Sequence, residues 1–256
     1  MRGLVSQAEI VFAVLLRETR TRFGAHQLGY LWALLEPMLM IITFFVMFAF
    51  IGRQAPDEMD LIGFLSTGIV PYVLFMNSVS RVAESINGNK GLLFYPHVQP
   101  LDLVYARTLL EFSTYIGVFV LLMGANAIYL QEFNIDSALQ IVFGMALASL
   151  LGATLGLVLC SLALFSNFVE RARGPILRPM FWVSGIFFTA NQLPEAARDK
   201  VLYNPLLHCV ELVRGGFYPA YDAVLADPYY VLMYILVFAT IGLPLERHVR
   251  HRIEVG

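Results

Sequence analysis

The chain has 256 residues, of which 58% are hydrophobic, 13% aromatic and only 14% charged. Average soluble domains carry about 25% charged residues, so this composition argues against a water-soluble enzyme of this size. The 17 Lys and Arg residues against 19 Asp and Glu give a net charge of −2, which gives no indication of nucleic-acid binding. Cys160 and Cys209 lack the spacing of a disulfide framework or a zinc site. The composition therefore predicts an integral membrane protein.

Residues 1–27 form the first predicted element, a helix that lies in the membrane interface. Between positions 4 and 23 the apolar side chains fall on one broad face, and Glu9, Arg17 and Arg20 fall on a narrow strip opposite. Amphipathic helices of this kind bind at the boundary between lipid headgroups and acyl chains. A plain topology anchor and a partner contact remain open for this segment. The Glu36-Pro37 pair predicts the turn into the first span, because proline suits the first turn of a helix.

Residues 28–250 are predicted to form one membrane domain with six transmembrane helices. A helix that crosses the hydrocarbon needs about 20 mostly apolar residues, and several segments satisfy this requirement. They are Leu34–Ile51, Leu61–Ser80, Phe112–Leu130, Ala138–Phe165, Ile176–Leu193 and Tyr229–Leu245. No acidic side chain is expected in their interiors, since Glu36 and Glu111 would lie near span ends.

Lys and Arg residues in the connecting segments predict the orientation. Thirteen of them fall before the first span, in the second and fourth loops and in the tail, against four in the other loops. By the positive-inside rule, both termini are expected in the cytoplasm.

The second cytoplasmic loop, GNKGLLFYPHVQPLD at 88–102, is unusual. Glycines, prolines and an asparagine interrupt it, yet the residues at 92–95 are too apolar for a free solvated loop. A loop of this kind normally docks against something. We interpret it as a coupling element that inserts into a groove of a partner, with burial against the protein's own helices as the alternative.

The fifth loop, at 194–228, is long and external. Prolines divide it, and residues 206–217 are too apolar for an exposed loop but too short to span a membrane. Two short re-entrant helices fit this pattern, because irregular backbone at membrane depth must be buried in protein or line a water-filled cavity. A gate and a packed external cap are both open alternatives.

Motifs for catalysis or nucleotide binding are missing from the sequence. It has no G-x-x-x-x-G-K-[ST] phosphate loop, no G-x-S-x-G and no H-E-x-x-H, and its five histidines are scattered. Ion-coupled carriers usually place ionisable groups at membrane depth, which is not expected here. We therefore expect no catalytic residue, metal or cofactor in this chain, and an energy source in another polypeptide.

Three blocks of sequence are informative together. They are RETRTRFG (17–24) with LGYLWALLEP (28–37), GLLFYPHVQPLD (91–102), and LRPMFWVSGIFF (177–188) with NPLLHCVELVRGGFYPAY (204–221). In combination they closely resemble the membrane subunit of bacterial ABC-2-type exporters for capsular polysaccharide, the KpsM-like permeases. The resemblance implies the ABC-2, or type V exporter, fold.

The resemblance also implies partners and cargo. The permease would be a homodimer of two six-helix halves, bound to two copies of a cytoplasmic subunit that binds ATP and Mg. The cargo would be an acidic, lipid-linked capsular polysaccharide, moved across the bacterial inner membrane. A periplasmic co-polymerase and an outer-membrane exporter would receive it.

Candidate functional residues follow from the resemblance together with the residue patterns. The family's coupling helix falls on Asn87, Gly88, Asn89, Lys90, Leu92, Phe94 and Tyr95. Aromatic candidates for the substrate path are Trp32, Phe44, Phe48, Tyr72, Phe75, Phe181 and Trp182. Guanidinium groups that would attract an anionic group at the cytoplasmic entrance are Arg17, Arg20, Arg22 and Arg178, for which membrane anchoring is an equal alternative. The external gate would hold Leu206, His208, Glu211, Arg214 and Phe217.

Alternatives remain for the function. One is an ABC-2 permease for O-antigen, teichoic acid or another lipid-linked glycan. Others, of different classes, are a standalone channel or secondary carrier and a membrane scaffold for a glycan synthase.

Overall fold

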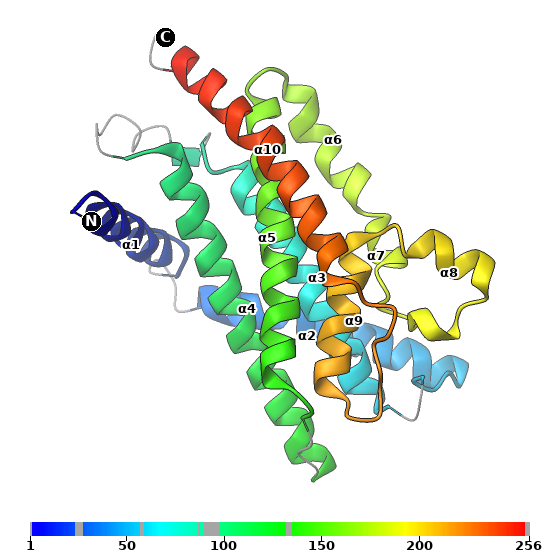
Figure 1. Ribbon diagram of the computed structural model, residues 1–256. Coiled ribbons are helices and arrows are strands. Elements are labelled where there is room, and N and C mark those ends of the chain that lie inside the picture. Colours follow the sequence, from blue (N-terminus) through cyan, green and yellow to red (C-terminus); the bar gives the residue numbers. More distant parts are fainter. Residues whose placement is uncertain are drawn as a thin grey trace.

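The computed structural model describes residues 2–23, 28–56, 59–86, 88–89, 98–131 and 135–253, and these residues are helical without strands. Long helices form a bundle, with shorter helices along one side (Figure 1). The helices are α1 Arg2–Phe23, α2 Leu28–Ile51, α3 Leu61–Ala83, α4 Pro100–Leu130, α5 Ala138–Ala163, α6 Asn167–Leu177, α7 Met180–Val183, α8 Glu195–Val201, α9 Pro205–Phe217 and α10 Pro228–Ile253. A short 3-10 turn, η2, covers Ala190–Gln192. The prediction of an all-α fold is confirmed.

Five helices in the described part of the chain are long and apolar enough to cross a membrane. Their apolar stretches are Leu31–Ile51, Leu61–Ala83, Pro100–Leu130, Ala138–Ala163 and Pro228–His248. They correspond to the first four predicted spans and the sixth. The amphipathic helix α1 and the C-terminal end of α10 lie toward the same end of the bundle (Figure 1). Which compartment this end faces stays a prediction.

The fifth predicted span, Ile176–Leu193, is not a continuous helix. It contains the end of α6, the single turn of α7, and an irregular segment that leads into η2. Proline removes a helical hydrogen bond, and Pro175 and Pro179 lie close to the break between α6 and α7. Gly185 then has a φ of +76°, which ends the helical conformation. Five of the six predicted spans are therefore continuous helices among the described residues, and the count of six is not confirmed at this element.

Helix α2 begins earlier than predicted, and Pro37 lies inside it instead of in its first turn. Its apolar stretch starts at Leu31, so Glu36 lies within the span and not near its end. The Glu36 carboxylate accepts hydrogen bonds from the Asn77 amide of α3 at 3.4 Å and the Tyr115 hydroxyl of α4 at 3.5 Å. Polar partners on two neighbouring helices thus accommodate a carboxylate in an apolar helix. Glu111 likewise lies within α4, buried and 3.7 Å from Arg81.

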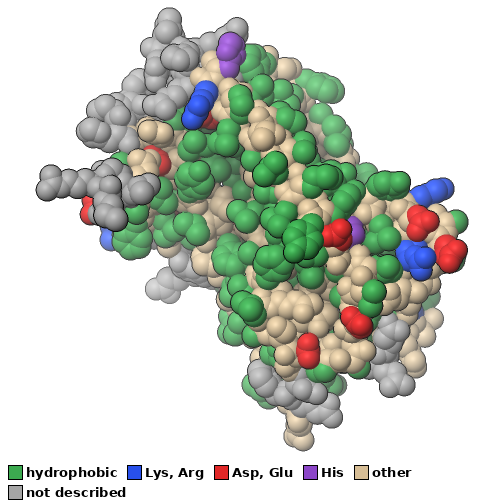
Figure 2. Space-filling model, in the orientation of Figure 1, with side chains coloured by type: hydrophobic (Ala, Val, Ile, Leu, Met, Phe, Trp, Pro, Cys, Tyr) green, Lys and Arg blue, Asp and Glu red, His purple; other side chains and the backbone are tan. Residues whose placement is uncertain are grey.

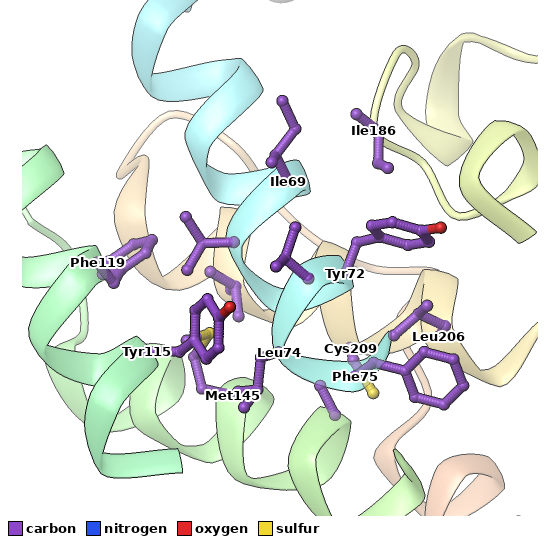
Figure 3. Packing of buried hydrophobic residues seen from close by; sticks show 14 of the residues in the cluster. Ile69, Tyr72, Leu74, Phe75, Tyr115, Phe119, Met145, Ile186, Leu206 and Cys209 are labelled. Carbon is purple, nitrogen blue, oxygen red and sulfur yellow. The ribbon is translucent and has the colours of Figure 1, made fainter. Parts of the chain in front are cut away.

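The core is built around α3, which is the most buried of the long helices. In Figure 3, Leu74 and Phe75 of α3 lie among side chains from neighbouring helices, including Tyr115 and Met145. Helix α5 packs closely against α3 because it presents glycines: a Cβ added at Gly152 would lie 2.6 Å from the Phe75 carbonyl oxygen. By contrast, most of the apolar stretches of α2 and α10 face outward. Hydrophobic side chains predominate on the face drawn in Figure 2, as expected for a surface in contact with lipid.

We predict that Gly152→Ala destabilises the protein by about 1–3 kcal/mol, because its methyl group would overlap a backbone carbonyl that cannot rotate away. Gly124→Ala in α4 is the matched control, since nothing lies within 4 Å of the added carbon. Alanine favours a helix more than glycine does, so the control is expected to be neutral or stabilising. Thermal unfolding of the two purified variants in detergent measures this difference. Equal midpoints would contradict the close α3–α5 contact.

Candidate functional site

The predicted coupling loop meets α1 at the edge of the described residues. Of the predicted coupling residues, Gly88 and Asn89 are described, whereas Asn87, Lys90, Leu92, Phe94 and Tyr95 lie outside the described residues. Asn89 is buried, and its amide oxygen accepts a hydrogen bond from the Arg17 guanidinium at 3.1 Å. Its amide nitrogen donates to Glu18 at 3.0 Å. The structure therefore brings the predicted interfacial helix into direct contact with the start of the predicted coupling loop.

The predicted entrance arginines do not form one cluster. Arg17 and Arg20 line a cavity of about 420 Å³ together with Ala13 and Leu16, so two cations lie beside an apolar floor. The side chain of Arg22 lies outside the described residues. Arg178 caps α6, which lies on the opposite side of the bundle from α1 (Figure 1). A shared anion site can include Arg17 and Arg20 but not Arg178.

Aromatic rings from three elements gather between α2, α3 and α7. Phe181 is at the centre, with its centroid 5.5 Å from that of Phe44, 5.1 Å from that of Tyr72 and 5.3 Å from that of Trp182. Five of the seven predicted path residues belong to this group, which we call the aromatic cluster: Phe44, Phe48, Tyr72, Phe181 and Trp182, joined by Phe187.

Two predicted path residues lie elsewhere. Trp32 is near the other end of α2 and is 66% exposed. Phe75 is fully buried in the core and lies beside Leu206 and Cys209 of α9 (Figure 3). Phe187, which was not predicted, joins the aromatic cluster at 4.6 Å from Phe44 and 5.4 Å from Trp182. The FF pair at 187–188 was visible in the sequence, but nothing local distinguished it from a lipid-facing pair.

Two arginines hold the irregular segment at 184–190, which carries Phe187, by hydrogen bonds to its backbone carbonyls. Arg214 of α9 donates to the carbonyl oxygens of Gly185 at 2.8 Å and Phe188 at 3.4 Å. Arg53, in the connection between α2 and α3, donates to the Phe187 carbonyl at 2.7 Å and lies 4.8 Å from the centroid of the Phe48 ring. Where the backbone stops being helical at membrane depth, its carbonyl groups lose their helical partners and require donors such as these. The two guanidinium groups therefore hold the segment that closes the aromatic cluster.

The charge of Arg214 is balanced within α9. Arg214 is fully buried, 3.0 Å from the Glu211 carboxylate, and its guanidinium lies 4.4 Å from the centroid of the Phe64 ring. Glu211 also accepts hydrogen bonds from the Tyr221 hydroxyl and from the Ala190 backbone at 3.4 Å. Hydrogen bonds thus satisfy most polar atoms of this buried ion pair, as such a pair requires, and the Arg214 Nε–H is the exception, without a hydrogen-bond partner among the described residues.

The other predicted gate residues are also largely packed inside the protein. Leu206 and His208 are buried in α9, and the ring of Phe217 packs edge-on against Phe119. The His208 ring is hydrogen-bonded at both nitrogens: Nε2 lies 2.9 Å from the Leu202 carbonyl oxygen, and Nδ1 accepts from the Asp227 backbone amide at 3.0 Å. These contacts show the packing expected of a cap, and a gating role stays a prediction.

The start of α3 and the C-terminal ends of α4 and α9 meet at Asp60. Its carboxylate accepts from the Tyr218 hydroxyl at 2.7 Å and from the Asn126 amide at 2.8 Å. Burial, and then the neighbouring Asp60 carboxylate, raise the pKa of Tyr218 above its usual range, so the phenol remains a hydrogen-bond donor. Among the described residues no group of three or more His, Cys, Asp or Glu could hold a metal ion.

The sequence of the chain matches a known family of membrane transporters. The sequence profile of the ABC-2 type transporter family matches residues 9–218, so the chain belongs to this family of membrane subunits.

Its similar relatives include three bacterial transport or export proteins. The polysialic acid transport protein KpsM of Escherichia coli is 34% identical over 245 residues, which cover 96% of this chain and 95% of KpsM. The capsule polysaccharide export inner-membrane protein CtrC of Neisseria meningitidis serogroup A is 31% identical, covering 95% of this chain and 92% of CtrC. The corresponding protein BexB of Haemophilus influenzae is 30% identical, covering 85% and 82%. The resemblance inferred from the three sequence blocks is confirmed.

We predict that Arg214→Met destabilises the protein by about 3–5 kcal/mol, because it leaves the Glu211 carboxylate without its buried counter-charge and two carbonyls without donors. Arg198→Met in α8 is the control, since that arginine is 3.9 Å from an exposed Glu195. Loss of such an exposed pair is expected to cost less than about 1 kcal/mol. Denaturant titration of both variants compares the losses. A similar loss in the two would show that the buried pair does not hold the segment.

Proposed function

We propose that this chain is the permease subunit of a bacterial ABC exporter that moves lipid-linked capsular polysaccharide across the inner membrane. The observation that carries the proposal is the 34% identity to KpsM over 96% of the chain, within a family match that covers residues 9–218. The apolar membrane helices agree with it.

The driving energy is expected from a separate ATP-binding subunit. The sequence contains no phosphate-binding loop, and an ABC transporter permease works with a subunit that has one. In this proposal two copies of the permease form a homodimer and bind two ATP-binding subunits, which hold ATP and Mg. This chain itself carries no cofactor. A periplasmic co-polymerase and an outer-membrane exporter take over the glycan.

The aromatic cluster is our candidate for the substrate path. Flat ring faces allow sugar rings to slide past without fixed hydrogen bonds, and the cluster presents Trp182, which is 61% exposed, at its outer side. The exposed faces of α2 and α7 would meet a second copy of the chain there. Arg17 and Arg20 are our candidates for the phosphate or carboxylate of the cargo at the entrance, because their cavity combines two guanidinium groups with apolar walls.

The proposal is tested by reconstitution into liposomes together with the partner ATP-binding subunit. We expect polysaccharide to stimulate ATP turnover and to accumulate on the far side of the membrane only when ATP is hydrolysed. The permease without its ATP-binding subunit is the control. Movement of glycan by the permease alone would contradict the proposal and favour a channel or a secondary carrier.

We predict that Trp182→Ala lowers glycan export about fivefold, because it removes a stacking surface from the path. Trp182→Phe, which keeps a ring, should retain most of the activity. Tyr129→Ala is the matched control, since Tyr129 is an exposed aromatic residue at the outer end of α4. Export per ATP-binding subunit measures the effect in the same liposomes. An equal loss in the Tyr129 and Trp182 variants would remove the aromatic cluster from the path.

A further inference from the structure

Helix α1 lies along the first turns of α4 through a single regular stripe of side chains. Val14 of α1 is buried against Leu103 and Ala106 of α4. One end of the stripe is fastened by the Gln7 amide, which donates to the Asp102 carboxylate. The other end is fastened by Glu18. The spacing of positions 7, 14 and 18 places these side chains on one face of α1.

Glu18 is bonded to two separate parts of the chain. Its Oε1 atom accepts from Arg107 of α4 twice, from Nε at 3.2 Å and from Nη2 at 3.1 Å. The same atom accepts from the Asn89 amide at 3.0 Å. The side chains of Arg107 and Glu18 are only 13% and 14% exposed, so solvent screens this ion pair less than a surface pair.

Hydrogen bonds hold the residues on both sides of the α3–α4 connection. On the α3 side, Asn89 also donates to the Ser85 carbonyl at 3.2 Å, and Arg107 donates to the Arg81 carbonyl at 2.6 Å. On the α4 side, Asp102 accepts from the Gln99 backbone amide at 2.8 Å as well as from Gln7 of α1. The connection therefore enters and leaves through residues that α1 contacts directly.

We propose that Glu18 is a positioning residue that joins α1, residues 84–86 and 88–89 after α3, and the start of α4 into one rigid unit. A displacement applied at the α3–α4 connection then moves α1 and α4 together, instead of bending α3 alone. This inference rests on the proposed function for its role in export, but the rigid unit itself is a property of the permease.

The rigid unit is tested first by amide hydrogen exchange on the permease in lipid nanodiscs. Glu18→Gln keeps the size and one acceptor oxygen but removes the charge that holds Arg107. We expect exchange at 84–86, at 88–89 and in the first turns of α4 to rise about tenfold, since hydrogen bonds to charged groups are among the stronger ones. Glu9→Gln is the matched control, because Glu9 carries the same charge on an exposed part of α1. Unchanged exchange in Glu18→Gln, or an equal rise in Glu9→Gln, overturns the proposal.

The consequence for export is measured as glycan moved per ATP hydrolysed in the reconstituted complex. Glu18→Gln should lower this ratio about tenfold while ATP turnover continues. The charge-swapped double variant, Glu18→Arg with Arg107→Glu, should restore part of the ratio. An unchanged ratio overturns the role of Glu18 in coupling.

If Glu18→Gln does not fold, Arg107→Gln tests the proposal by the same two measurements, because it removes the ion pair and leaves the contact between Glu18 and Asn89. If the unsubstituted complex moves no glycan, the proposed function fails, whereas the exchange result still stands or falls on its own.

Discussion

The arrangement of α7, α9 and the irregular segment between them depends on the hydrogen bonds that Arg214 donates to the carbonyl groups of Gly185 and Phe188. A chain that stops being helical inside an apolar bundle exposes carbonyls that neither lipid nor aliphatic side chains can satisfy. Arginine supplies several donors from one rigid group, and Glu211 balances its charge at 3.0 Å. The short helix α9 can therefore lie inside the bundle, where a continuous span would otherwise be required.

This arrangement depends in turn on close packing between helices. Helix α9 approaches α5 at Gly144, where an added Cβ would lie 2.9 Å from a methyl group of Val213. The irregular segment crosses α3 at Gly68, where an added Cβ would lie 2.9 Å from the Cα atom of Ile186. In membranes, small residues allow helices to gain van der Waals contact that the hydrophobic effect does not supply. The buried α3 and α5 thus form the rigid part of the molecule, and α2 and α10 remain at its surface.

Much of this fold was predictable from the sequence, because long apolar segments and an amphipathic N-terminus are local signals. The residues that break the helix, Pro175, Pro179 and Gly185, are also visible in the sequence. The prediction of one continuous span there relied on hydropathy, which does not detect such a break. The contacts that organise the candidate sites were not predictable. Arg53 meets Phe187 across 134 positions, and Glu18 meets Arg107 across 89 positions. The residues next to Arg53 and Glu18 in the sequence do not reveal these contacts, because the contacts depend on how the helices pack.

The same packing connects the two ends of the protein through side-chain contacts. Arg107, which bonds to α1, and Tyr115 are eight residues apart on α4, or about 12 Å along the helix. Tyr115 and Asn77 bond to Glu36 of α2, and the Phe44 ring of the aromatic cluster lies about 12 Å further along α2. Helix α4 thus contacts both α1 and the Glu36 carboxylate, and α2 carries both that carboxylate and the Phe44 ring, so a chain of side-chain contacts links the end that holds α1 to the aromatic cluster. The hydrogen bonds from Asn77 and Tyr115 also explain why an ionisable group is tolerated at a depth where hydropathy alone would exclude it.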